Sequence, residues 1–264
     1  MSDAPTLRSG TPQSFALCLR KGAISTLNDW VIIIVLTLIP GIAMPIGASF
    51  AGLERIRPRW LESEVRHSVI AFGGGALLAA VALVLVPEGI RNLDPLLIVV
   101  CFMSGAAAFL LLDVLLAAKA TPASQLVAML SDFVPEALAL GATFAVSKAS
   151  GVLLAGIIAL QNLPEGFNAC GEVTNSTHYR VSQVIGAFTL MALLGPIAGL
   201  TGYFVLSDFP ELVSAISLFA AGGILYLIFQ DIAPQAKLEK HWAPPLGAVA
   251  GFLLGVMGKV AVGA

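Results

Sequence analysis

The sequence predicts an all-α integral membrane protein with eight transmembrane helices. Of the 264 residues, 58% are hydrophobic and 11% are charged, and the mean hydropathy is +0.92. A soluble domain carries about a quarter charged residues, so this chain has too little polar surface to cover a fold in water. Its apolar runs are close to the ~20 residues that cross a bilayer as a helix, and they are too long and continuous for barrel strands.

Eight apolar segments follow one another along the chain and are joined by short connections. Residues 1–26 are polar and are predicted to form an N-terminal tail, whereas residues 27–264 are predicted to form one eight-helix transmembrane domain. The predicted spans are 27–52, 67–87, 96–118, 125–147, 151–169, 184–206, 215–234 and 245–262.

The distribution of basic residues predicts how these spans are oriented. Alternate connections hold most of the positive charge, namely Arg55, Arg57, Arg59, Arg66, Lys119, Arg180, Lys237 and Lys240. Cytoplasmic loops of membrane proteins carry an excess of Lys and Arg, so these connections are predicted to face the cytoplasm. Because the number of spans is even, both termini are predicted to be extracytoplasmic in a multi-pass protein of the cell membrane. No basic face suggests nucleic-acid binding.

The second and seventh spans share a short sequence pattern of two glycines followed by a proline. Gly74-Gly75 is followed by Pro87, and Gly222-Gly223 is followed at a similar distance by Pro234. The two spans run in opposite directions, so we expect a 3+2+3 arrangement in which an inverted repeat flanks the fourth and fifth helices.

Two short motifs in the fourth and fifth spans place polar residues inside apolar runs. Asp132 precedes Glu136 by four positions, and Gln161 precedes Glu165 by four, with a proline just before each glutamate. Positions i and i+4 share one face of a helix. Proline cannot donate a backbone hydrogen bond, so each motif also frees a carbonyl oxygen. Carboxylates and spare carbonyls together suggest a cation site.

Depth in the membrane supports convergence of the two motifs. If the hairpin between the fourth and fifth helices turns near Gly151, Glu136 and Glu165 lie at nearly equal distances from the turn. Asp132, Gln161 and Asn162 then fall within one helical turn of that level. Acidic residues inside spans without a basic partner are costly and mark functional sites, and this set is expected to bind a cation.

The other intramembrane acids are expected to have different roles. Asp113, in the third span, is expected to make an interhelical polar contact or to mark a helix end. Glu88 is expected at the membrane interface. For Asp231, in the seventh span, two roles stay open: lining the ion's route, or a hydrogen bond across helices.

The run Gln161-Asn162-Leu163-Pro164-Glu165-Gly166 resembles the HNxPEG-type signature of the ZIP (Zrt/Irt-like protein) metal transporters, and Asp132–Glu136 matches the position of the family's first such motif. The resemblance covers residues 27–264. It implies a permease for divalent transition metals such as zinc, iron or manganese, and in some cases cobalt, nickel or cadmium, as substrate and with no cofactor. It also implies binding between helices four and five, and movement of one helix bundle against a scaffold, often within a homodimer.

On this resemblance the metal ligands are expected to be Asp132, Glu136, Gln161, Asn162 and Glu165, with Asp231 at the edge of the site or on the exit route. Four positions differ from the family pattern. Asp132 and Gln161 replace histidines, Phe133 replaces an asparagine, and Ala192 stands where helix six commonly supplies a glutamate. The differences favour one mononuclear site over a binuclear centre, and broad divalent selectivity over a strong zinc preference.

Two other classes of function remain open from the sequence. The loss of the histidines is compatible with a relative that senses metal without transporting it. An intramembrane enzyme is less well supported, because the chain has no HExxH, GxGD-like or GxSxG motif. Metal flux, metal binding without flux, and hydrolysis would distinguish the three.

Overall fold

The computed structural model describes residues 28–53, 59–119, 122–206, 208–236 and 243–263. Helices account for 93% of these residues, and no strand occurs among them. The predicted all-α class is therefore confirmed for the described part of the chain. The predicted polar tail, 1–26, and the basic residues Arg55, Arg57, Lys237 and Lys240 lie outside the described residues.

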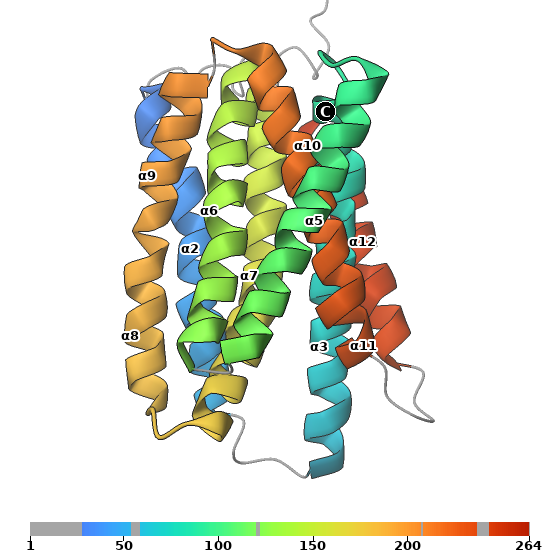
Figure 1. Cartoon of the computed structure of the whole chain (residues 1–264). Helices are drawn as coiled ribbons and strands as arrows, with labels where there is room; N and C mark the ends of the chain where they lie inside the picture. Colours follow the sequence, from blue (N-terminus) through green and yellow to red (C-terminus); the bar gives the residue numbers. More distant parts are fainter. Residues whose placement is uncertain (1–27, 54–58, 120–121, 207, 237–242, 264) are drawn as a thin grey trace, which may run out of the picture.

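The described helices form elongated rods that run up and down the molecule (Figure 1). The first rods are α2 (Asp29–Leu53), the continuous series α3 (Arg59–Ala80), η2 (Val81–Leu85) and α4 (Val86–Gly89), and then α5 (Pro95–Lys119), α6 (Pro122–Val146) and α7 (Lys148–Ser176). The series α8 (Val181–Ala192), α9 (Leu194–Thr201) and η3 (Gly202–Leu206) follows, then α10 (Pro210–Leu227), η4 (Ile228–Ile232) and α11 (Ala233–Ala236), and finally α12 (Ala243–Val262).

Six stretches of the described chain are helical, long and apolar enough to cross a membrane. They are Asp29–Ala51, Glu64–Gly89, Pro95–Leu116, Val181–Leu206, Pro210–Ala236 and Ala243–Val262. Two of these stretches pack little against the rest of the protein. In Pro95–Leu116 and in Ala243–Val262, only 11% of the most apolar part is buried. Long apolar helices that leave large side chains on the outer surface are typical of a multi-pass membrane protein.

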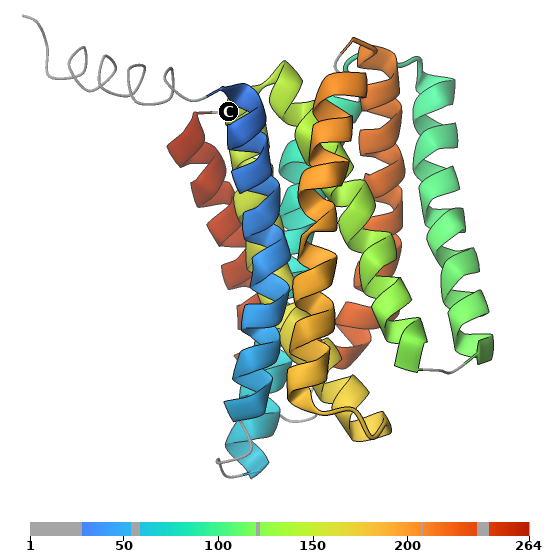
Figure 2. The same ribbon diagram turned by 90° about the vertical axis from the view of Figure 1, so that its left-hand side faces the viewer.

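The helices pack in two groups. One group contains α2, α6, α7, α8 and α9, in which α2 lies along α7 and α6 packs on α9 and α7. The other contains α3, α5, α10, α11 and α12, in which α3 lies along α12 and α5 packs on α10. The most extensive contact between the groups is that of α3 with α7 (Figures 1 and 2).

The hairpin between α6 and α7 turns at Ser147, not at Gly151 as the sequence suggested. The hydroxyl of Ser147 accepts a hydrogen bond from the backbone N–H of Ser150 and caps α7. Gly151 instead allows the two helices to approach closely, because a Cβ there would lie 2.6 Å from Cβ of Phe144. With the turn at Ser147, Glu136 lies closer in height to Gln161 than to Glu165, and Asp132 lies one helical turn farther from the hairpin.

The second and seventh rods share a distortion just before a proline. The π-helical segment η2 ends two residues before Pro87, and η4 ends two residues before Pro234. Proline has no N–H, so Pro87 leaves the carbonyl of Leu83 without its helical partner. The ammonium group of Lys259, on α12, donates to that carbonyl at 2.9 Å. Lys259 therefore satisfies a backbone group that the proline exposes.

A buried apolar cluster fills the half of the molecule nearest the α6–α7 turn. Leu140 of α6, Leu154 and Ile158 of α7, Leu77 of α3 and Ile224 of α10 belong to it, and each is at most 1% exposed. All the members on α6 and α7 lie between the turn and the motif residues along their helices. This cluster separates the motif residues from that end of the molecule.

Candidate functional site

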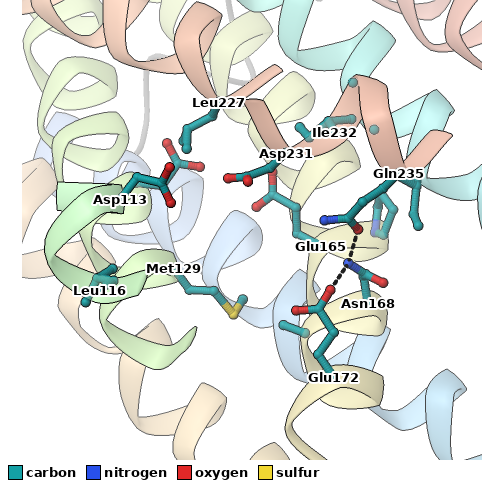
Figure 3. A pocket seen from close by; sticks show the side chains of 16 residues that line it. Asp113, Leu116, Met129, Glu165, Asn168, Glu172, Leu227, Asp231, Ile232 and Gln235 are labelled. Carbon is teal, nitrogen blue, oxygen red and sulfur yellow. Dashed lines mark hydrogen bonds between the residues drawn. The ribbon is translucent and has the colours of Figure 1, made fainter. Parts of the chain in front are cut away.

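A cavity of about 350 Å³ opens in the opposite half of the molecule, between the two groups of helices. Its walls come from the second half of α3, the first half of α6, the last part of α5 and α7, and the η4–α11 region (Figure 3). Five of the side chains that line it are acidic: Asp113, Asp132, Glu165, Glu172 and Asp231. A cavity lined by one sign of charge attracts ions of the opposite sign.

Glu136 and Gln161 lie deeper than the cavity wall and join α6 to α7. The amide Nε2 of Gln161 donates a hydrogen bond of 2.6 Å to Oε1 of Glu136. Glu136 is 3% exposed and Gln161 is fully buried. The hydrogen bond places these two side chains side by side between the helices.

Three oxygen atoms of the predicted ligand set are buried without a hydrogen-bond partner. They are Oδ1 of Asp132, Oε2 of Glu136 and Oε1 of Gln161. Buried oxygens without a donor cost about 1–3 kcal/mol each, and more where they are charged. In the described part of the chain six buried side-chain atoms are unpartnered in this way, so half of them belong to this one set.

Asp132 and Glu165 connect this deep pair to the cavity, since both line its wall. Asp132 is 8% exposed, whereas Glu165 is half-buried. The carboxylate of Glu136 experiences Coulombic repulsion from both Asp132 and Glu165. Three neighbouring carboxylates therefore lack a compensating positive charge, which a bound cation would supply.

Asp231 faces the same cavity from η4, with Asp113 of α5 nearby. Figure 3 shows Asp113, Asp231 and Glu165 pointing toward one another across the cavity. The hydroxyl of Tyr226 donates to Oδ2 of Asp113 at 3.1 Å. Asp113 thus makes the interhelical contact expected from the sequence and also lines the cavity, which the sequence did not indicate.

Asn162 makes a different contact from the other predicted ligands. It does not line the cavity, and its Nδ2 donates to the carbonyl oxygen of Pro40 on α2 at 3.0 Å. Asn162 is 2% exposed. In this arrangement it attaches α7 to α2 within the same group of helices.

The sequence interpretation missed Asn168 and Glu172, two further polar residues of the cavity. With Gln161 and Glu165 they continue one polar face of α7, because the four residues are spaced by four, three and four positions. That spacing was visible in the sequence, but Glu172 lies beyond the predicted end of the fifth span, and Asn168 lies one residue before it. Asn168 and Glu172 line the cavity together with Gln235 of α11.

Ala192 occupies the position of the glutamate that the family pattern would supply to a second metal. It is an apolar packing residue. It is 1% exposed, and Cβ at Gly41 of α2 would lie 2.8 Å from its Cα. It does not line the cavity. Phe133, next to Asp132, is likewise buried in an apolar cluster with Phe188 and Met191.

The donor set of the site consists of carboxylate and amide oxygens. Such ligands suit hard divalent cations such as Mn²⁺ and also accept Zn²⁺ and Fe²⁺. Within the described residues, no three His, Cys, Asp or Glu side chains are grouped closely enough to hold one metal ion together. In this conformation, an ion at Asp132 and Glu136 would complete its shell with the amide oxygen of Gln161 and with water.

The fold and the cavity define an all-helical, multi-pass membrane-type protein with an acidic cavity between two groups of helices. Comparison with models of known protein families and with curated proteins found no match for this chain.

Proposed function

We propose that this protein is a ZIP-like permease that carries divalent transition-metal cations such as zinc, iron or manganese across a membrane. The observation that carries the proposal is the group of three unpartnered buried oxygens on Asp132, Glu136 and Gln161, next to an acidic cavity. A buried group of carboxyl and amide oxygens without donors is suited to binding a cation. Glu165 and Asp231 are the residues from which the ion passes to and from the cavity.

In this proposal α6 and α7 cross the membrane together with the six long apolar stretches, which gives eight spans. The prolines and polar side chains of α6 and α7 interrupt otherwise apolar runs, as in transporter helices that line a substrate site. The two π-helical segments, each followed by a proline, support the inverted repeat proposed for the second and seventh spans, with α6 and α7 between the halves.

The proposed orientation places the acidic cavity on the cytoplasmic side. The ends of α5 and α7, which line the cavity, lie at the lower end of the molecule in Figure 1. The described chain begins and ends at the other end (Figure 2), which is the extracytoplasmic side in this proposal. Arg180, at the lower end, is one of the basic residues that predict this orientation.

Transport then follows from alternating access to the site between α6 and α7. In the arrangement described, the cavity leads toward the cytoplasm, and the apolar cluster around Leu140, Leu154 and Ile158 closes the opposite route. The buried oxygens of Asp132, Glu136 and Gln161 replace water molecules on one side of the ion. The wider acidic surface of Asp113, Glu172 and Asp231 attracts the hydrated ion or disperses it after release, because several like charges act together.

The proposal is tested first by metal binding to the purified protein in detergent. Titration calorimetry with Mn²⁺ and with Zn²⁺ should give one site per chain, and Glu136→Gln should weaken binding at least about tenfold, since it removes a charged oxygen ligand. Glu211→Gln is the matched control, because Glu211 is an exposed carboxylate in the first turn of α10.

The outcome also separates the proposal from its rivals. Binding that depends on Glu136, but with no flux in proteoliposomes, would identify a metal sensor. An absence of binding in the wild-type protein would contradict both the permease and the sensor, and a hydrolysis assay would then test the enzyme class.

A further inference from the structure

A network of hydrogen bonds joins the two groups of helices beside the acidic cavity. Arg66 of α3 donates to Oδ1 of Asn168 on α7 from Nε at 3.3 Å and from Nη2 at 2.7 Å. Nδ2 of the same Asn168 donates to Oε1 of Gln235 on α11 and to Oε1 of Glu172, both at 3.0 Å (Figure 3). One carboxamide therefore bridges α7 to two helices of the other group.

The guanidinium of Arg66 determines how this carboxamide is oriented. It occupies the oxygen of Asn168, so the nitrogen of Asn168 must face Glu172 and Gln235. A guanidinium has five donors in a rigid fork and remains charged at all physiological pH values. Its bonds to a neutral acceptor are charge-assisted and stronger than bonds between two neutral groups.

Beside this network, α3 meets α7 at a glycine. Cβ at Gly73 of α3 would lie 2.8 Å from Cγ of Pro164 on α7. The backbone of α3 therefore approaches Pro164 with no side chain of its own between them. A surface without interlocking side chains resists sliding less than one with them.

We propose that Arg66, Asn168 and Gln235 form a latch that holds α7 against α3 and α11 in the arrangement with the cavity open. This inference rests on the proposed alternating access, because the latch matters only if the two groups move relative to each other. Sliding or tilting of α7 along α3 must break both bonds from Arg66, whereas it leaves the glycine contact free to move. Arg66 is thus a positioning residue that acts through Asn168, without contacting the ion.

The latch is tested by the accessibility of the cavity in the full-length protein, with no metal present. Leu227 lines the cavity and is partly buried, so Leu227→Cys serves as the reporter in a background in which Cys18, Cys101 and Cys170 are alanine. The rate of alkylation by a water-soluble maleimide then measures the fraction of time that the cavity is open.

Arg66→Gln and Asn168→Ala should each slow alkylation by about tenfold, the change expected for loss of one charge-assisted hydrogen bond. The double variant should be no slower than the slower single variant, because both changes break the same connection. Arg66→Lys should restore the rate only partly, since an ammonium cannot reproduce the fork. Arg180→Gln, which removes an exposed arginine near the same end of the molecule, should leave the rate unchanged.

Unchanged alkylation in Arg66→Gln and Asn168→Ala, or fully additive slowing in the double variant, would overturn the latch. Gln235→Ala keeps the test decisive if Arg66→Gln does not fold, because Gln235 is an exposed side chain at the end of its rod. The latch would also be overturned if Gln235→Ala is alkylated at the wild-type rate. Since no metal is used, failure of the latch leaves the metal-binding result intact, and failure of metal binding leaves the latch result intact.

Discussion

Gln161 and Glu136 are joined by a 2.6 Å hydrogen bond at a buried polar point between α6 and α7. The bond uses one oxygen of Glu136 and leaves the other without a partner. The carboxylate is therefore supported by α7 on one side and still able to bind a cation on the other.

Replacing Gln161 with leucine should destabilise the protein by about 1–3 kcal/mol, because Glu136 then loses its hydrogen-bond donor while it stays buried. Adding Glu136→Leu to this variant should recover part of the loss, since no unpaired polar group then remains. Thermal unfolding in detergent without metal measures both effects, with Gln230→Leu at an exposed position as the control. Equal stability of the single and double variants would show that the bond does not matter.

The orientation is tested by two exposed positions at opposite ends of the molecule. Asp94 precedes α5 and His178 lies between α7 and α8, and both are exposed. In a cysteine-free background, Asp94→Cys should react with an impermeant thiol reagent in intact cells, and His178→Cys only after permeabilisation. The physical reason is the excess of basic residues near the His178 end. Labelling in the reverse order would invert the topology and place the acidic cavity on the outside.

Much of the helical architecture could be predicted from apolar runs of bilayer length. The third predicted span, 96–118, differs from α5 by one residue at each end. The fifth, 151–169, was seven residues too short at its C-terminus, because hydropathy falls after Cys170 although the helix continues to Ser176. Val173 on this extension is buried in an apolar cluster, which supports the helix beyond the predicted span.

The composition of the candidate site could be predicted better than its geometry. The spacing of Asp132 with Glu136, and of Gln161 with Glu165, predicted two polar faces, but their relative height depended on which residue makes the turn. The cavity-lining position of Asp113 could not be predicted, because α5 is apolar on all sides and its sequence does not reveal which side faces the protein. That choice depends on packing against α10.

Lys259 offers a test of the proline distortion in the second span. Lys259→Met should destabilise the protein by about 1–2 kcal/mol, because the carbonyl of Leu83 loses its donor. In a Pro87→Ala background the same change should cost less, since alanine restores a backbone N–H at that position, which can reach the carbonyl. Chemical or thermal unfolding of the four proteins measures the coupling. An equal cost in both backgrounds would mean that Lys259 acts elsewhere.

Selectivity follows from the ligand types. With carboxylates and amides and no imidazole or thiolate at the site, Mn²⁺ and Fe²⁺ should compete well with Zn²⁺ for binding. Asp132→His together with Gln161→His should shift competition toward Zn²⁺, because imidazole nitrogen is a better ligand for zinc than for manganese. Competition calorimetry measures the shift. A wild-type site that binds zinc tightly and shows no measurable manganese binding would contradict this account.

The most direct test of the central claim is uptake of Mn²⁺ or Zn²⁺ into proteoliposomes that contain the purified full-length protein. The account predicts saturable uptake by the wild type and by Glu211→Gln, and loss of at least about 90% of it in Glu136→Gln and in Glu165→Gln, because each removes a charged oxygen from the proposed ion path. Both site variants must reach the membrane in wild-type amounts for the comparison to hold. Uptake at the wild-type rate in Glu136→Gln would contradict the claim that the ion passes between α6 and α7.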